Sequence, residues 1–162
     1  MNKLKLSLIA IAMSITSNAN ASDFYQCMPC PAGTYFSDGK CTPCPDYYWS
    51  DPGSTECGRM RGDLYYFWSV WERHVPVLAG NSLTCNNNNF SDPIEHKTKN
   101  CTFGGIGFNY MQEGWTFNFN CKKLPCELPP GYQNHRLRIT TTGMIEGSYD
   151  GRNWFGIGRI YW

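Results

Sequence analysis

Residues 27–57 read CMPCPAGTYFSDGKCTPCPDYYWSDPGSTEC and hold five of the nine cysteines of this 162-residue chain. The stretch contains no leucine, isoleucine or valine. A segment this poor in aliphatic side chains cannot bury enough apolar surface to fold alone, so cross-links between its cysteines must stabilise it. Cysteines form such cross-links as disulfides or as zinc thiolates, and the two chemistries belong to different cellular compartments.

The first 21 residues have the three parts of a secretory signal peptide. Lys3 and Lys5 make the start basic, an apolar run interrupted only by serines covers residues 6–15, and Ala19-Asn20-Ala21 provides small residues for cleavage. The run is shorter than the about 20 residues that span a bilayer as a helix. We therefore expect a signal peptide at residues 1–21, a mature chain that begins at Ser22, and a secreted or extracytoplasmic protein (periplasm or cell surface in a bacterium).

Without its signal peptide, the chain is close to electrically neutral. Removing Lys3 and Lys5 from the 14 basic residues leaves 12, against 13 acidic ones. This balance indicates neither nucleic acid nor an anionic membrane surface as a partner. After residue 21 no apolar run reaches the length of a transmembrane helix, and no cofactor motif is present, so we expect neither a membrane span nor a cofactor.

The spacing C-x2-C-x10-C-x2-C from Cys27 to Cys44 fits a four-cysteine zinc site as well as two disulfide loops. Proline occupies the third position of both CxxC pairs and the position after each pair, at residues 29, 31, 43 and 45. Zinc thiolates accept hydrogen bonds from nearby backbone N–H groups, and proline has none. Export also favours oxidation, so disulfides are the preferred interpretation and no metal is expected.

The segment CPAGTYFSDGKCTPC, residues 30–44, resembles the cysteine-rich repeat of ephrin-receptor-like modules, which are related to tumour-necrosis-factor-receptor repeats. A second copy follows at residues 44–57, where Tyr47-Tyr48-Trp49 replaces Gly-Thr-Tyr. The resemblance implies a module over residues 22–58, with disulfides Cys30–Cys41 and Cys44–Cys57 and with Tyr35 packed on them. Such repeats are spacers or binding surfaces in extracellular proteins and carry no catalytic function.

Residues 59–162 have the patterns of a β-rich domain. Residues 115–121, WTFNFNC, alternate in polarity and place Trp115, Phe117, Phe119 and Cys121 on one face of a predicted strand. Residues 136–142, RLRITTT, alternate in the same way, and Asp150-Gly151 predicts a two-residue hairpin turn. Residues 63–71, DLYYFWSVW, fit a buried strand or a short helix that reaches residue 74, and residues 84–93 have the composition of a loop. The expected fold class is a small disulfide-rich module followed by a mainly β domain, as an antiparallel sheet or a sandwich.

Four further cysteines lie in this β-rich part, and four cysteines allow three pairings. From their proximity in the sequence we expect Cys85–Cys101 and Cys121–Cys126. Cys27 is then the unpaired member of an odd set of nine. An exposed thiol in an oxidising compartment seldom stays free, so we expect Cys27 to form an intermolecular disulfide and a covalent dimer. Pairing of Cys27 with one of the other four is the alternative.

Two motifs are candidates for ligand binding. Arg61-Gly62-Asp63 is the tripeptide that integrin ligands display on exposed loops, although a Gly-Asp turn before a strand explains it equally well. The segment SYDGRNW, residues 148–154, is similar to the S-x-D-G-x-x-W hairpin of discoidin-type and other glycan-binding β-sandwiches, which would give Trp154 a binding role. A hairpin whose tryptophan packs in the core is the structural alternative.

No catalytic motif accompanies these candidates. The chain has no GxSxG, HExxH or glycine-rich phosphate loop, and His74, His96 and His135 lack the spacing of a metal site. We therefore expect a secreted, non-catalytic binding or interaction protein whose partner is a protein or a glycan. A structural envelope component that is cross-linked through its odd cysteine and a small secreted hydrolase are the alternatives.

Overall fold

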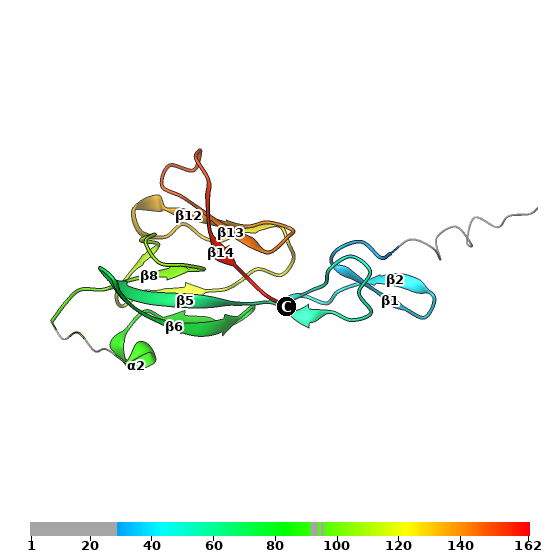
Figure 1. The fold of residues 1–162 in the computed structure, drawn as a ribbon, viewed down its shortest axis with the longest axis horizontal. Coiled ribbons are helices and arrows are strands. Elements are labelled where there is room, and N and C mark those ends of the chain that lie inside the picture. Colours follow the sequence, from blue (N-terminus) through cyan, green and yellow to red (C-terminus); the bar gives the residue numbers. More distant parts are fainter. Residues whose placement is uncertain (1–28, 92–93, 95) are drawn as a thin grey trace, which may run out of the picture.

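The computed structural model describes residues 29–91, 94 and 96–162. The expected signal peptide, the expected mature start at Ser22, and Cys27 lie outside these residues. Figure 1 shows a small cysteine-rich part at one end of the molecule and a larger β-rich part at the other.

The cysteine-rich part consists of two short antiparallel strand pairs, each closed by a local disulfide. Strand β1 (Thr34–Ser37) pairs with β2 (Lys40–Pro43), and β3 (Tyr48–Trp49) pairs with β4 (Gly58–Arg59). The disulfides Cys30–Cys41 and Cys44–Cys57 join Cα atoms that are 5.4 and 5.8 Å apart. These are the two pairs that the ephrin-receptor-like resemblance implied. Because these sulfurs are covalently paired, they are not available as the zinc thiolates of the alternative interpretation.

Trp49 forms the interior of this small part. Its ring is buried and lies against Gly33, where an added Cβ would come within 2.6 Å of the ring. Gly33 also has φ +77°, a left-handed conformation that glycine adopts without steric cost. Tyr35, to which the resemblance assigned the packing role, is only partly buried.

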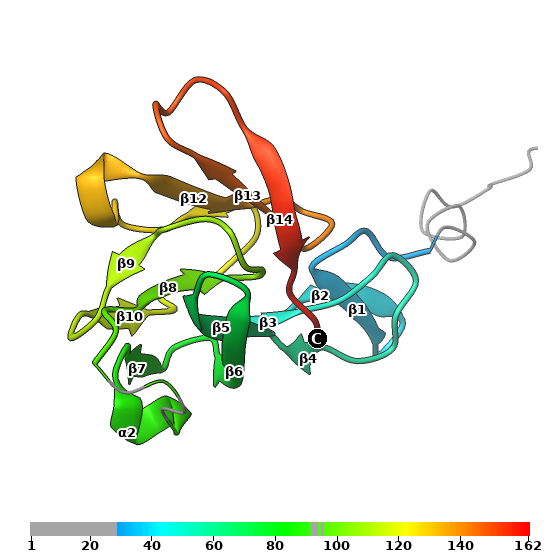
Figure 2. The same ribbon diagram turned by 60° about the vertical axis from the view of Figure 1, so that its left-hand side comes forward.

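Two four-stranded antiparallel sheets make up most of the β-rich part (Figures 1 and 2). The first has the order β6-β5-β8-β9, from β5 (Arg61–Trp68), β6 (Trp71–Leu78), β8 (Asn100–Phe103) and β9 (Met111–Gln112). The second has the order β11-β12-β13-β14, from β11 (Cys126–Glu127), β12 (Arg136–Ile139), β13 (Met144–Ser148) and β14 (Phe155–Arg159). A short pair of β7 (Ser82–Thr84) with β10 (Thr116–Asn118), the one-turn helix α2 (Asn87–Phe90) and the 3-10 turn η1 (Tyr132–Asn134) complete it. The expected fold class is confirmed.

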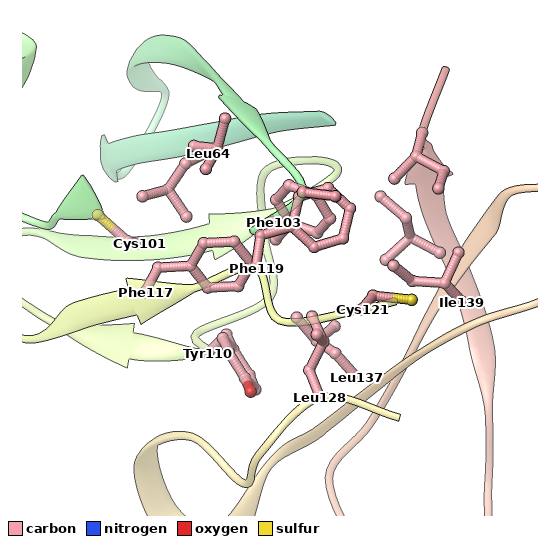
Figure 3. Close-up of a cluster of buried hydrophobic side chains, with 14 of the residues drawn as sticks. Leu64, Cys101, Phe103, Tyr110, Phe117, Phe119, Cys121, Leu128, Leu137 and Ile139 are labelled. Carbon is pink, nitrogen blue, oxygen red and sulfur yellow. The ribbon is translucent and has the colours of Figure 1, made fainter. Parts of the chain in front are cut away.

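Aromatic rings fill the space between the sheets (Figure 3). The ring of Phe103 lies 4.7 Å from that of Phe117 and 4.8 Å from that of Phe119, measured between centroids. Leu137 and Ile139, which alternate with arginines along β12, are fully buried in the same cluster. The predicted alternation of residues 136–139 is therefore confirmed. Trp115 is exposed, so its predicted position on the buried face with Phe117 and Phe119 is wrong.

Three local expectations also change. Of the two alternatives for residues 63–71, the buried strand is correct as far as Trp68, since residues 63–68 belong to β5. The helix is wrong, and Ser69 and Val70 make a two-residue turn before β6. The asparagine-rich stretch, expected to be a loop, contains α2, because the side chain of Asn86 accepts a hydrogen bond from the backbone N–H of Asn89 and caps the helix. Asp150-Gly151 is not a two-residue hairpin turn, since six residues, 149–154, separate β13 from β14.

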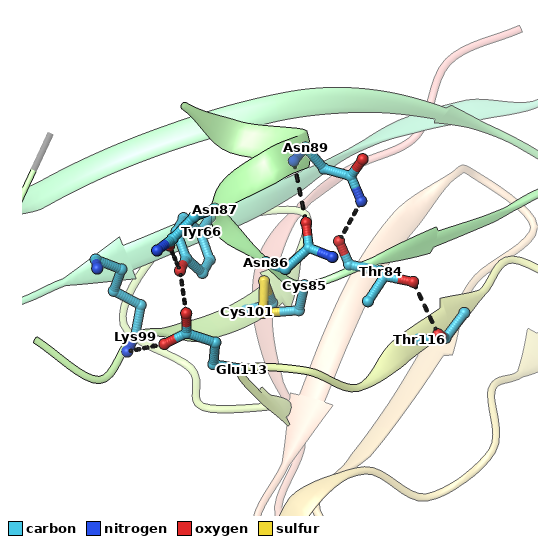
Figure 4. The surroundings of a disulfide bond; sticks show 10 residues. All are labelled: Tyr66, Thr84, Cys85, Asn86, Asn87, Asn89, Lys99, Cys101, Glu113 and Thr116. Atoms are coloured by element: carbon cyan, nitrogen blue, oxygen red, sulfur yellow. Dashed lines mark hydrogen bonds between the residues drawn. A yellow bond between two sulfur atoms is a disulfide. The ribbon is translucent and has the colours of Figure 1, made fainter. Parts of the chain in front are cut away.

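The other two disulfides are Cys85–Cys101 and Cys121–Cys126, as proximity in the sequence favoured. Figure 4 shows a polar cluster beside the first of them. The Tyr66 hydroxyl lies within hydrogen-bond distance of Glu113 Oε1, at 2.9 Å, and of Asn87 Oδ1, and its single proton is donated to one of them at a time. The backbone N–H of Lys99 donates to Glu113 Oε2 at 3.2 Å. This network attaches α2 to the first sheet.

The cysteine-rich and β-rich parts are in direct contact. The backbone N–H of Tyr47 donates to the carbonyl of Lys122 at 2.9 Å, and the Lys123 ammonium donates to the carbonyl of Cys44. The expected boundary between residues 58 and 59 falls within β4, where Gly58 packs against the backbone of Trp162. Within the described ranges, no helix is both long enough and apolar enough to cross a membrane.

Candidate functional site

The two four-stranded sheets meet along a seam where glycines replace side chains. Gly158 of β14 approaches Gly104, the residue after β8, so closely that an added Cβ at position 158 would lie 2.5 Å from the carbonyl carbon of Gly104. An added Cβ at Gly105 would likewise overlap the carbonyl oxygen of Ile157. The backbones are therefore in contact, and the surface above them has no side chain to fill it.

A groove of about 390 Å³ lies along this seam. Its size falls within the range of about 300–1,000 Å³ that small-ligand sites occupy. Glycine backbone and a few larger side chains line it, from Asp63 and Tyr65 of β5, Gly104, Met144 of β13, Gly156, Gly158 and Arg159 of β14, and Tyr161. We call this feature the seam groove.

The polar groups of the seam groove converge. Burial raises the pKa of Tyr65, and the negative charges of Asp63 and Glu72 and the Tyr161 hydroxyl raise it further. Tyr65 therefore stays a protonated phenol that can donate a hydrogen bond at neutral pH, with Asp63 near enough to influence it. The Tyr65 ring lies 5.3 Å from that of His74.

Tyr161 forms the exposed wall of the groove. Its side chain is 55% exposed, whereas its backbone exchanges two hydrogen bonds of 2.8 Å with Arg61. This isolated bridge fixes residue 161 beside β5. The tyrosine is thus held in place by its main chain and keeps its ring free for contact with a ligand.

The Arg61-Gly62-Asp63 tripeptide lies inside β5 and pairs with Leu78, Val77 and Pro76 of β6. Its expected display on an exposed loop, as in integrin ligands, is therefore wrong, and so is the alternative of a turn before a strand. Gly62 is buried, and an added Cβ at this position would overlap the ring of Phe103. Of the three residues, only Asp63 lines the seam groove.

Trp154 lies at the end of the loop that joins β13 to β14, and it is partly buried rather than packed in the core. The Asp150 carboxylate organises this loop by accepting hydrogen bonds of 2.8 Å from the backbone N–H groups of Arg152 and Asn153. The hydrogen bonds from Asn153 and Arg152 hold the pKa of Asp150 well below its usual range. The Arg138 guanidinium covers one face of the Trp154 ring at 4.2 Å.

A charged row connects Trp154 to the seam groove. Glu127, Arg138, Glu146 and Gly156 are successive register partners across β11, β12, β13 and β14, so they share one face of the sheet. Arg138 Nε donates to Glu146 Oε2 at 2.5 Å. Glu127 and Arg138 line a second groove of about 440 Å³, and Gly156 lines the seam groove at the other end of the row.

The described part of the chain contains no group of three or more His, Cys, Asp or Glu residues that could hold a metal ion. His135 is buried, and its Nδ1 lies 2.5 Å from the carbonyl oxygen of Asn109. Its ring packs against those of Phe108 and Tyr149. His135 is thus part of an aromatic cluster.

The fold and the site define a disulfide-stabilised, mainly antiparallel β protein of the kind that persists in an oxidising compartment. No family model, curated protein or solved structure matches this chain. The seam groove therefore has to be interpreted from its own residues.

Proposed function

We propose that the chain is a secreted, non-catalytic binding protein that takes a hydroxyl-rich ligand, a short glycan, in the seam groove. The observation that carries the proposal is the convergence of Tyr65, Tyr161, Asp63 and Arg159 over a floor of glycine backbone. Phenols, a carboxylate and a guanidinium supply the donors and acceptors that sugar hydroxyls require. The tyrosine rings add flat apolar area for the sugar ring.

The lining of the groove favours binding over hydrolysis. Among the described residues, it contains one carboxylate and one arginine, and no histidine, serine or cysteine. Hydrolysis of a glycosidic bond ordinarily requires two carboxylates that flank the bond, and nucleophilic catalysis requires an activated serine or cysteine. A single acid beside an arginine and two phenols is suited to orienting a ligand.

Export is the second element of the proposal. The basic start, apolar run and Ala19-x-Ala21 support a signal peptide at residues 1–21, and the four disulfides fit an oxidising compartment. The cysteine-rich part, with its ephrin-receptor-like spacing, would act as a stiff spacer that presents the β-rich part. Amino-terminal sequencing of the protein from an extracytoplasmic fraction tests this. A first residue of Ser22 supports export, and an intact Met1 in a cytosolic fraction contradicts it.

Binding is tested with the mature protein on a glycan microarray, and hits are quantified by titration calorimetry. We expect Tyr161→Ala to lower the affinity for any validated glycan at least tenfold, because the exposed ring is lost while the main-chain bridge to Arg61 remains. Phe36→Ala is the matched control, since Phe36 is an exposed aromatic side chain, at 45%, outside the groove. If a glycan binds both variants with the affinity that it has for the native chain, the seam groove is not its binding site. An array without a validated hit would also refute the proposal.

A further inference from the structure

The turn between β5 and β6 exposes apolar side chains that the fold does not use. Val70 is 94% exposed at its tip, and Trp68, which precedes the turn, is 38% exposed. Trp71, the register partner of Trp68, is only partly buried. We call these three side chains, with Ser69, the hairpin tip.

The hairpin tip has a serine at a turn position where the backbone conformation favours glycine or asparagine. Ser69 has φ 54°, a left-handed conformation that two-residue hairpin turns usually assign to glycine or asparagine. The chain instead places serine there and a fully exposed valine beside it. Six other non-glycine residues of the described chain also have positive φ, so the exposed Val70, rather than the conformation of Ser69, distinguishes the tip.

Two cations lie against the tryptophans of the tip. The Arg73 guanidinium is 5.1 Å from the centre of the Trp71 ring, and Lys97 Nζ is 5.4 Å from the centre of the Trp68 ring. Glu72 is the neighbouring acid, but it pairs with Phe67 and therefore points to the opposite face of the hairpin. Among the described residues, Arg73, Lys97 and Lys99 lie on the face that carries both tryptophans, against one acid, Glu113, which bonds the Tyr66 hydroxyl. This face therefore has an excess of positive charge, although the chain is nearly neutral overall.

The tip lies on the opposite face of β5 from the seam groove. Trp68 is three residues, about 10 Å, from Tyr65 of the groove, and an odd separation along a strand places the two side chains on opposite faces. Figure 1 shows β5 and β6 running together away from the cysteine-rich part, with their turn at the far end. A tip whose valine is 94% exposed is accessible to a soft surface.

We propose that the hairpin tip docks on the surface of an anionic lipid bilayer, with Val70 and the two tryptophans at the headgroup boundary. Tryptophan favours this boundary because its ring is apolar and its N–H is polar. Arg73 and Lys97 would face the anionic headgroups. The small apolar area makes the contact peripheral and reversible, and it does not depend on what the seam groove binds.

The test is co-sedimentation of the mature protein with vesicles of phosphatidylcholine and phosphatidylglycerol at a ratio of about 3:1, at low salt. We expect the native protein to bind and its tryptophan emission to shift to shorter wavelength. Val70→Asp should reduce the bound fraction at least tenfold without lowering the melting temperature, because the native valine makes almost no contact with the fold. Ile106→Asp is the matched control, since Ile106 is an exposed aliphatic side chain, at 48%, on another part of the surface.

A second variant separates the charge from the apolar contact. Lys97→Glu should weaken binding to the anionic vesicles several-fold and leave any residual binding to pure phosphatidylcholine unchanged. The proposal is overturned if native protein does not sediment with anionic vesicles, which would leave a protein pocket as the alternative occupant. It is also overturned if Val70→Asp binds as the native protein does, or if Ile106→Asp loses as much binding.

Discussion

Replacing Gly158 by alanine tests the backbone contact that creates the seam groove. An added Cβ would lie 2.5 Å from the carbonyl carbon and 2.9 Å from the Cα of Gly104. Carbon atoms pack at about 3.5–4.0 Å, so one backbone must move by about 1 Å, and neither belongs to a flexible side chain. Overpacking of this kind costs on the order of 3 kcal/mol. We expect a fall in melting temperature of about 10 °C for a domain of this size.

Gly156→Ala is the matched control in the same strand. An added Cβ there would meet only the Met144 sulfur, at 3.7 Å, which is an ordinary contact. Alanine also restricts the unfolded chain, so the control should be neutral or stabilised by about 0.5 kcal/mol. Thermal unfolding of both variants, followed by circular dichroism with the disulfides intact, measures the difference. Equal melting temperatures for the two variants would show that the sheets do not meet backbone to backbone.

Three other measurements address the disulfides, the Asp150 loop and Cys27. Replacing both cysteines of Cys85–Cys101, which are 16 residues apart, should cost about 3 kcal/mol in a urea titration, against about 2 kcal/mol for Cys121–Cys126, which are 5 apart; a reversed order would contradict the loop-length reasoning. Because the folded-state pKa of Asp150 is depressed, its ionised form stabilises the fold above its ordinary pKa of 3.8, and this stabilisation is lost as the pH falls below that value. The melting-temperature difference between native protein and Asp150→Asn should therefore shrink in acid, and a constant difference would exclude this carboxylate as its source. Non-reducing electrophoresis should show a covalent dimer that disappears in Cys27→Ser, whereas a native monomer would remove the intermolecular disulfide.

Local features of this fold followed from the sequence because local physics determines them. Proximity in the sequence predicted Cys85–Cys101 and Cys121–Cys126, and the resemblance to ephrin-receptor-like repeats implied Cys30–Cys41 and Cys44–Cys57. The alternation in residues 136–139 predicted a strand with one buried face. The prediction of a two-residue turn at Asp150-Gly151 was wrong. The dipeptide pattern does not show that the Asp150 carboxylate accepts hydrogen bonds within a longer loop of six residues.

The seam groove could not be predicted, because its parts are far apart along the chain. Gly104 and Gly158 meet across two different sheets, and each looks like an ordinary loop or strand glycine in the sequence. Asp63 was singled out for the wrong reason, as part of a loop motif, and its partners Tyr65, Arg159 and Tyr161 carried no signal. The glycine alternation at residues 156 and 158 was the one visible hint, since alternate glycines in a strand indicate close approach of another backbone.

The bridge between Arg61 and Tyr161 has a consequence for the timing of folding. It joins positions 100 residues apart. The β5 side of the groove is therefore synthesised near the beginning of the β-rich part, and the Tyr161 side is synthesised 100 residues later. Contacts of such high sequence separation form late, because the chain must first lose the entropy of closing a long loop. A nascent or carboxyl-terminally trimmed chain would thus have the disulfide ladder of the cysteine-rich part and the β5–β6 hairpin before it had a groove. Ligand binding would then require that the β-rich part had been synthesised and folded as far as residue 161.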